Sequence, residues 1–146
     1  MSEKIPFVTK EQLEDIASRY ATPFYLYDEK GIRETARRVN KAFSWNKGFK
    51  EYFAVKATPT PGILKILHEE GCGADCSSYT ELLMADAVGF KGDEIMFSSN
   101  DTPAEDFQLA RKLNATINLD DITHIQCLED TLGFIPETIS CRYNPG

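Results

Sequence analysis

One lysine of this 146-residue sequence lies where it could act chemically. Lys56 follows the apolar run Tyr52-Phe53-Ala54-Val55, so we place it at the carboxyl end of a strand. Active sites of parallel βα sheets form at that end of the strands. A lysine in a partly apolar pocket loses its proton more easily, and its neutral amine can form a Schiff base with an aldehyde. The alternative is a lysine that extends into solvent and has no chemical role.

Two acidic residues lie in and shortly after the next predicted strand. Asp75 precedes Cys76 within a predicted strand, where a carboxylate needs a partner, and Lys56 on the adjacent strand is the expected one. A direct contact between Asp75 and Lys56 would keep the lysine charged. Glu81 completes a Ser78-x-x-Glu81 pattern, which is a helix capping box and needs no ligand to explain it.

Further polar residues lie at later strand ends. Arg142 lies at the end of the last predicted strand, where pairing with a neighbouring carboxylate would explain it. Ser98, Ser99 and Asn100 follow the third strand and could contact a ligand or simply satisfy a turn. His68 and His124 lie in predicted helices without neighbouring metal ligands, so we predict no metal site and interpret both as surface or packing residues.

These residues are positioned by an alternation of short apolar runs and helix-like segments of about ten residues, which indicates a parallel α/β sheet. The five predicted strands are Tyr52 to Ala57, Ala74 to Ser77, Ile95 to Ser98, Ala115 to Leu119 and Thr138 to Tyr143. The predicted helix starts are Ser78, Thr102 with Pro103 as the first helical residue, and Asp120 or Asp121. Gly71, Gly89 and Gly133 lie where helices should end.

The segment before this alternation contains two more predicted helices. Thr9 begins a capping box with Gln12, which indicates a helix from about Lys10 to Arg19. Phe24 to Tyr27 is rich in aromatic residues, as short strands are. Apolar residues at helical spacing predict an amphipathic helix from Glu29 to about Phe43, with Asp28 as its N-cap.

Composition excludes several functional classes. The sequence has 42% hydrophobic and 27% charged residues and a net charge of −7, without a basic block that could follow a nucleic-acid backbone. It has no apolar run long enough to span a membrane, and its amino end lacks the apolar core of a signal peptide, so we expect a cytoplasmic protein. The four cysteines form no CxxC pair and are expected to be reduced thiols in the core.

Four segments, in this order, resemble the pyridoxal-phosphate-dependent decarboxylases of the alanine-racemase fold, which include the diaminopimelate, ornithine and arginine decarboxylases. They are Thr-Pro-Phe-Tyr-Leu-Tyr-Asp at 22–28, Tyr-Phe-Ala-Val-Lys-Ala-Thr-Pro at 52–59, Gly-Ala-Asp-Cys-Ser-Ser-Tyr-Thr-Glu-Leu at 73–82 and Cys-Arg-Tyr-Asn-Pro-Gly at 141–146. The first and last favour the diaminopimelate branch, whereas the third is closer to ornithine decarboxylases. Thr58 departs from the asparagine usual in the family, and we expect this to affect loop contacts only.

The resemblance implies roles for four residues. Lys56 matches the lysine that binds pyridoxal 5′-phosphate and later gives up its place to the substrate amine, while the protonated pyridine ring accepts electrons as the carboxylate leaves as CO2. Asp75 and Glu81 match acidic residues near that lysine. Arg142 matches an arginine that reaches toward the cofactor's phenolic oxygen. The implied reaction is conversion of meso-diaminopimelate to L-lysine and CO2, with an ornithine or arginine decarboxylase as the alternative.

The resemblance also implies an incomplete (β/α)8 barrel, because the full barrel takes about 250 residues and eight strands. We expect residues 1–146 to be the amino-terminal part of the pyridoxal-phosphate-binding barrel, with the rest of the barrel and a carboxyl-terminal β domain absent. The isolated piece is then expected to be inactive, and the complete enzyme to be a homodimer acting on a small amino acid. Two alternatives are a non-catalytic relative that keeps the barrel for protein contacts, which has no need of Lys56, and a small α/β domain that binds a phosphorylated ligand.

Overall fold

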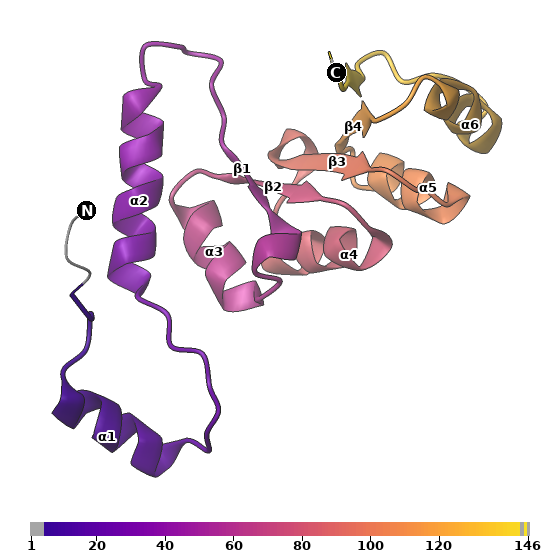
Figure 1. The fold of residues 1–146 in the computed structure, drawn as a ribbon. Helices are drawn as coiled ribbons and strands as arrows, with labels where there is room; N and C mark the ends of the chain where they lie inside the picture. Colours follow the sequence, from indigo (N-terminus) through magenta and orange to yellow (C-terminus); the bar gives the residue numbers. More distant parts are fainter. Residues whose placement is uncertain (1–4, 144, 146) are drawn as a thin grey trace.

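The structure is a computed structural model that describes residues 5–143 and 145 (Figure 1). Helices and strands alternate after two leading helices, as the sequence pattern predicts. In chain order the elements are α1 (Lys10–Arg19), α2 (Glu29–Ala42), β1 (Tyr52–Ala54), the 3-10 helix η1 (Val55–Ala57), α3 (Pro61–Glu69), β2 (Gly73–Cys76), α4 (Tyr79–Val88), the 3-10 helix η2 (Gly92–Glu94), β3 (Ile95–Ser99), α5 (Ala104–Lys112), β4 (Thr116–Leu119), α6 (Thr123–Leu132) and β5 (Ser140–Cys141).

The five strands form one parallel sheet in the order β1-β2-β3-β4-β5, which confirms the predicted α/β class. Each strand is joined to the next by a helix, so every carboxyl end lies at the same edge of the sheet. Within the described part of the chain, β1 and β5 each pair with a single neighbour, and the sheet is therefore open. None of the helices in this part is long and apolar enough to cross a lipid bilayer.

Side chains alternate between a buried and a free face of this sheet. One face carries the buried residues Ala74, Cys76, Ile95, Phe97, Ile117 and Leu119. These pack in one core with Leu64 of α3, Leu82 of α4, Phe107 of α5 and Leu128 of α6. Ala54, Asp75, Met96 and Thr116, which are in register across four strands, are only partly buried on the opposite face. Helices α3 to α6 therefore cover one face, and a partly polar face is left open.

The amino-terminal segment differs in part from the prediction. Helix α1 has the predicted bounds and the predicted capping box between Thr9 and Gln12. The predicted strand at Phe24 to Tyr27 is wrong, because this segment is not paired with any strand and Tyr25 is 89% exposed. A strand requires a neighbour for its backbone groups, and this segment lies apart from the sheet (Figure 1). Aromatic content alone therefore mispredicts it.

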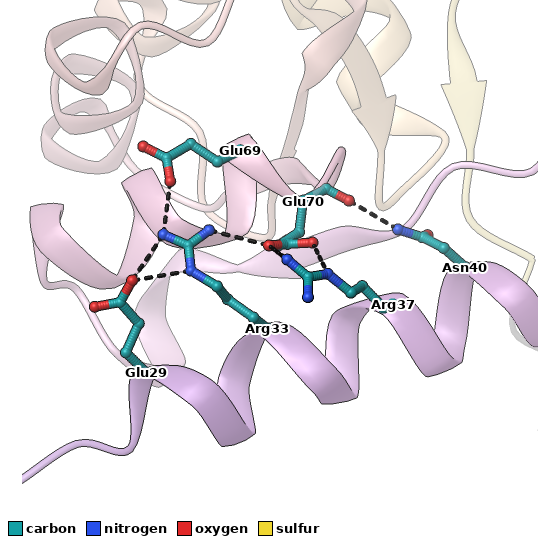
Figure 2. A network of polar contacts seen from close by, with 6 residues as sticks. All are labelled: Glu29, Arg33, Arg37, Asn40, Glu69 and Glu70. Carbon is teal, nitrogen blue, oxygen red and sulfur yellow. Dashed lines mark hydrogen bonds and ion pairs between the residues drawn. The ribbon is translucent and has the colours of Figure 1, made fainter.

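Helix α2 is attached to α3 by a cluster of ion pairs (Figure 2). Arg33 donates to Glu69 at 2.7 Å and to Glu70 at 3.0 Å, and Arg37 donates to the two carboxylate oxygens of Glu70 at 2.6 and 2.7 Å. Asn40 donates to the backbone carbonyl of Glu70 at 3.0 Å. Arg37 and then Arg33 hold the pKa of Glu70 below its usual range. We call these residues, with Glu29, the α2–α3 clamp.

The helix ends follow local signals with two exceptions. Gly71, Gly89 and Gly133 have positive φ angles at the ends of α3, α4 and α6, as predicted. The N-cap of α6 is Ile122, not Asp120 or Asp121, although Asp121 accepts from the backbone N–H of Thr123 at 2.8 Å. The second exception is Pro103, which occupies the N-cap position of α5 rather than its first turn. Its ψ of 152° is extended, so the helix begins one residue later, at Ala104.

All four cysteines are free, but only two of them lie in the core. Cys72 and Cys76 are buried, and burial raises the pKa of Cys76 to about 12. That thiol is therefore protonated and unreactive at neutral pH. The expectation of core positions is wrong for Cys127 and Cys141, which are exposed. Cys141 lies on β5, the last strand of the open sheet, where no further element covers it within the described residues.

A close contact at the amino end of β2 predicts that only glycine fits at position 73. A Cβ on Gly73 would lie 2.6 Å from the ring of Tyr52 and 2.7 Å from the backbone oxygen of Glu94. We expect Gly73→Ala to lower the free energy of unfolding by about 1–3 kcal/mol, as overpacking does, in urea denaturation. Gly62→Ala in α3 is the matched control, since nothing lies within 4 Å of its Cβ. Equal stability of the two variants would contradict this contact.

The α2–α3 clamp predicts a pH-dependent contribution to stability. Because the pKa of Glu70 is lowered in the folded state, its stabilising effect is complete above the unfolded-state pKa and is lost as the pH falls through the folded-state value. Glu70→Gln should therefore lower the urea midpoint at neutral pH, and the difference from wild type should shrink in acid. Glu34→Gln is the control, because its pair with Lys30 is 3.9 Å long and exposed. A difference that is constant with pH would show that packing, not charge, holds α2.

Candidate active site

Lys56 lies at the carboxyl edge of the sheet, as predicted, but on a turn rather than in the strand. Strand β1 ends at Ala54, and residues 55–57 form the 3-10 helix η1. The last residue of β1 in register with β2 is Ala54, opposite Asp75, and the side chain of Val55 is fully buried. The turn therefore anchors itself in the core through Val55, while the next residue, Lys56, is exposed.

Asp75 lies on the free face of β2, next to the end of β1. Its Oδ1 is buried and has no hydrogen-bond partner among the described residues. Burial raises the pKa of Asp75, the positive charge of Lys56 opposes that effect, and Glu81 adds to it. The predicted direct contact with Lys56 is absent, since no hydrogen bond or ion pair joins the two within the described part of the chain. Lys56 acts on Asp75 through its charge alone.

Glu81 forms only half of the predicted capping box. Its backbone N–H donates to the hydroxyl of Ser78 at 3.4 Å, which caps α4. Its carboxylate does not return to the backbone of Ser78 but accepts from the N–H of Ser77 at 2.8 Å and from the Ser77 hydroxyl at 3.1 Å. Glu81 thereby fixes the turn that joins β2, which carries Asp75, to α4. Glu81 therefore lies near the predicted site, and its hydrogen bonds to Ser77 explain its position without a ligand.

Arg142 pairs with a neighbouring carboxylate at the end of β5, which is the explanation without a ligand that the sequence suggested. Its Nη1 donates to Asp120 Oδ1 at 2.8 Å, and its backbone N–H donates to the carbonyl of Leu119 at 2.9 Å. The other carboxylate oxygen of Asp120 accepts from Asn100 at 2.9 Å. Asn144 and Gly146 of the closing sequence motif lie outside the described residues.

The three polar residues after β3 divide between a turn and the free face. Ser99 is buried and donates to the backbone of Asp101, which is the turn role considered from the sequence. Ser98 faces the other way and accepts a hydrogen bond from Asn118 of β4 at 2.9 Å. Sequence reasoning missed Asn118. An amide between Ile117 and Leu119 in an otherwise apolar strand was the signal that could have found it.

Neither histidine has the surroundings of a catalytic group. The ring of His68 lies 4.3 Å from that of Phe90, with Nε2 3.3 Å from Glu94. His124 lies edge-on to Phe107, and its buried Nδ1 has no hydrogen-bond partner among the described residues. No group of three potential metal ligands occurs in residues 5–143 and 145. Both side chains therefore serve packing.

An apolar groove lies away from these residues. It has a volume of about 580 Å³, and it is lined mainly by side chains of α2, α3 and β1, among them Ile32, Val39, Phe53 and Ile63. Thr58 reaches its edge, whereas Lys56, Asp75 and Arg142 do not line it. We therefore locate the candidate site by its chemistry. An exposed amine, a partly buried carboxylate and a guanidinium share one edge of the sheet, and this set suits a ligand with a carbonyl carbon and anionic oxygens.

The sequence is similar to curated proteins over most of its length. Protein TabA of Pseudomonas amygdali pv. tabaci is 41% identical over 133 residues, covering 91% of this chain and 30% of TabA. Diaminopimelate decarboxylase of Methanothermobacter thermautotrophicus is 35% identical over 134 residues, covering 90% of this chain and 31% of the relative. The chain thus spans about a third of the length of the relatives it matches.

Solved structures and a family model agree with these relatives. Diaminopimelate decarboxylase from Helicobacter pylori, complexed with L-lysine, has a TM-score of 0.76 and 32% identity over 91% of this chain and 34% of its own. Ornithine decarboxylase from Entamoeba histolytica has a TM-score of 0.76 and 26% identity over 92% of this chain and 42% of its own. Residues 29–146 match the family model described as pyridoxal-dependent decarboxylase, pyridoxal binding domain. The chain therefore belongs to the pyridoxal-dependent decarboxylase family, through residues 29–146, which match the model of its pyridoxal-binding domain.

Proposed function

We propose that this chain is the part of an amino-acid decarboxylase in which Lys56 binds pyridoxal phosphate. The observation that carries the proposal is the exposed amine of Lys56 beside a carboxylate, Asp75, whose buried Oδ1 lacks a hydrogen-bond partner in the described residues. A buried polar atom without a partner is costly, so its presence favours a ligand that completes the site. The family to which the chain belongs supplies the cofactor class.

The residues at the carboxyl edge fit this cofactor. Lys56 would hold its aldehyde carbon, and the free N–H groups of Arg142 would face an anionic oxygen. Asp75 has an unused oxygen at the open face, where it could accept a proton from the amine of Lys56. When bound, pyridoxal phosphate supplies an electron-withdrawing ring that stabilises the charge left when a carboxylate departs as CO2.

Each residue then has a distinct task. The Nζ of Lys56 must lose a proton before it can bond to carbon, and Asp75 can receive that proton because burial raises the pKa of its carboxyl group. Glu81 holds the turn after β2 through Ser77 and so fixes the position of Asp75. Arg142 balances negative charge at the far side of the site, from the end of β5.

For the substrate we propose meso-diaminopimelate, which would yield L-lysine and CO2. The support is the diaminopimelate decarboxylase at 35% identity and the Helicobacter pylori structure at 32%. The second candidate is ornithine, which is favoured by the Asp-Cys-Ser-Ser segment at 75–78 and by the Entamoeba histolytica structure at 26% identity. A non-catalytic relative is disfavoured because Lys56 is retained. A homodimer and a cytoplasmic location stay predictions.

Trapping of the cofactor tests the proposal directly. We expect the chain, mixed with pyridoxal phosphate and reduced with borohydride, to carry the adduct on Lys56, because this amine lies beside Asp75 at the edge of the sheet. Lys56→Ala should lose the adduct, as peptide mass spectrometry would show. Lys65→Ala, which removes an exposed lysine of α3, is the matched control and should keep it.

Labelling spread over the surface lysines of the wild-type chain would contradict a formed site. The same experiment separates the two substrates, because an amine that takes the place of Lys56 on the cofactor protects Lys56 from reduction. Protection by meso-diaminopimelate at a lower concentration than by ornithine supports the first substrate, and the reverse order supports the second.

The raised pKa of Asp75 predicts that its ionised carboxylate lowers the free energy of unfolding of the protein. In the folded state its pKa lies above the unfolded value, so the destabilisation is absent in acid, grows as the pH rises, and is complete above the folded-state pKa. Asp75→Asn should therefore raise the free energy of unfolding at neutral pH, on the order of 1 kcal/mol, with no gain in acid. It should also reduce trapping at Lys56.

Urea denaturation over a pH series measures this effect. Asp101→Asn is the control, since Asp101 is exposed and its replacement should change neither quantity. A stability gain for Asp75→Asn that persists unchanged into acid would assign the effect to packing instead of charge.

A further inference from the structure

Three polar side chains at the carboxyl edge form a connected group. Asp120, which follows β4, accepts from Arg142 Nη1 at 2.8 Å with one oxygen and from Asn100 Nδ2 at 2.9 Å with the other. Asn100 follows β3, and Arg142 follows β5, so the group joins the ends of three strands. The side chain of Asp120 is 22% exposed and that of Arg142 is 54% exposed.

This geometry holds the guanidinium of Arg142 in one place. Its backbone is tied to Leu119 by a 2.9 Å hydrogen bond, and its side chain is tied to Asp120 through a single nitrogen. A guanidinium has five N–H donors, so most of them remain free for an anionic oxygen. Asp120 is itself fixed by Asn100, which leaves the arginine with one favoured orientation.

Stability does not account for this arrangement. An ion pair with a half-exposed arginine contributes little to folding, because water screens the charges and two side chains lose freedom. What such a pair does supply is a defined direction for the remaining donors. The group also lies at the edge where the site is located, with both oxygens of Asp120 engaged and the guanidinium partly open.

We propose that Asp120 is a positioning residue for the pyridoxal-phosphate site, acting by aiming Arg142 at an anionic oxygen of the bound ligand, with Asn100 holding Asp120 in turn. This inference rests on the proposed function, because the ligand is the one bound through Lys56. It assigns to Asp120 no contact with the reacting atoms. Its effect reaches the ligand only through Arg142.

The test measures the pyridoxal phosphate concentration that gives half-maximal borohydride trapping on Lys56 in the full chain. We expect Asp120→Ala to raise this concentration about two- to fivefold, the range of one partly exposed ion pair. Arg142→Ala should raise it at least as much, and the double variant should match Arg142→Ala alone, because both changes remove the same interaction. Asn100→Ala should give a smaller increase than Asp120→Ala.

Two controls separate positioning from stability. Asp86→Ala removes an ion pair with Lys91 of 2.6 Å at the end of α4 and should leave trapping unchanged. Thermal unfolding should show Asp120→Ala within about 2 °C of wild type, as for surface substitutions. If Asp120→Ala is unfolded, Asp120→Asn replaces it, because asparagine keeps the shape and one acceptor oxygen. The double variant with Arg142→Ala should then again need the same pyridoxal phosphate concentration as Arg142→Ala alone.

Two results would overturn the inference and leave the proposed function intact. In the first, Asp120→Ala needs the same pyridoxal phosphate concentration as wild type. In the second, the increases in this concentration caused by Asp120→Ala and Arg142→Ala multiply in the double variant. Failure of the proposed function gives a different result, since the wild-type chain itself would then lack a specific adduct on Lys56. That outcome overturns both.

Discussion

The one-sided burial of the parallel sheet is the constraint on which the rest of the structure depends. Alternate residues of the strands enter a core shared with α3 to α6, so their neighbours must lie on the opposite, open face. Strand register then groups those neighbours in rows. Ala54, Asp75, Met96 and Thr116 form one row, and Ser98, Asn118 and Ser140 form a second row nearer the carboxyl edge.

Around this face, connections after the strands perform the fine positioning. Glu81 secures the turn that follows β2, and Asp120 connects the ends of β3, β4 and β5. Glu81 and Asp120 each use both carboxylate oxygens in hydrogen bonds. The neighbouring residue in each case, Asp75 or Arg142, keeps unused hydrogen-bonding capacity. Rigid supports around incompletely satisfied groups are what a binding site requires, since the supports set geometry and the free groups supply the interaction with a ligand.

The sequence pattern predicted the alternating strands and helices and the position of Lys56 at the carboxyl edge of the sheet, but not individual contacts. All five strands overlap their predicted ranges, because short apolar runs that alternate with helix-like segments are a strong local signal of a parallel sheet. The aromatic segment at 24–27 misled because nothing local reveals whether a strand has a neighbour. The predicted contact between Lys56 and Asp75 is absent because β1 ends three residues earlier than predicted, so that Lys56 lies in a turn anchored by Val55. Asn118 was overlooked because its partner, Ser98, lies twenty residues away in the sequence.

The α2–α3 clamp also indicates where the folding unit begins. Asn40 of α2 satisfies the backbone carbonyl of Glu70, the residue that ends α3, so the end of α3 is completed by a side chain from before the first strand. Helix α2 is accordingly an integral layer of the sheet domain, although it is not enclosed between strands. The family match begins at residue 29, the first residue of α2, and therefore coincides with a physical boundary. Helix α1, which buries none of its residues, lies outside that unit.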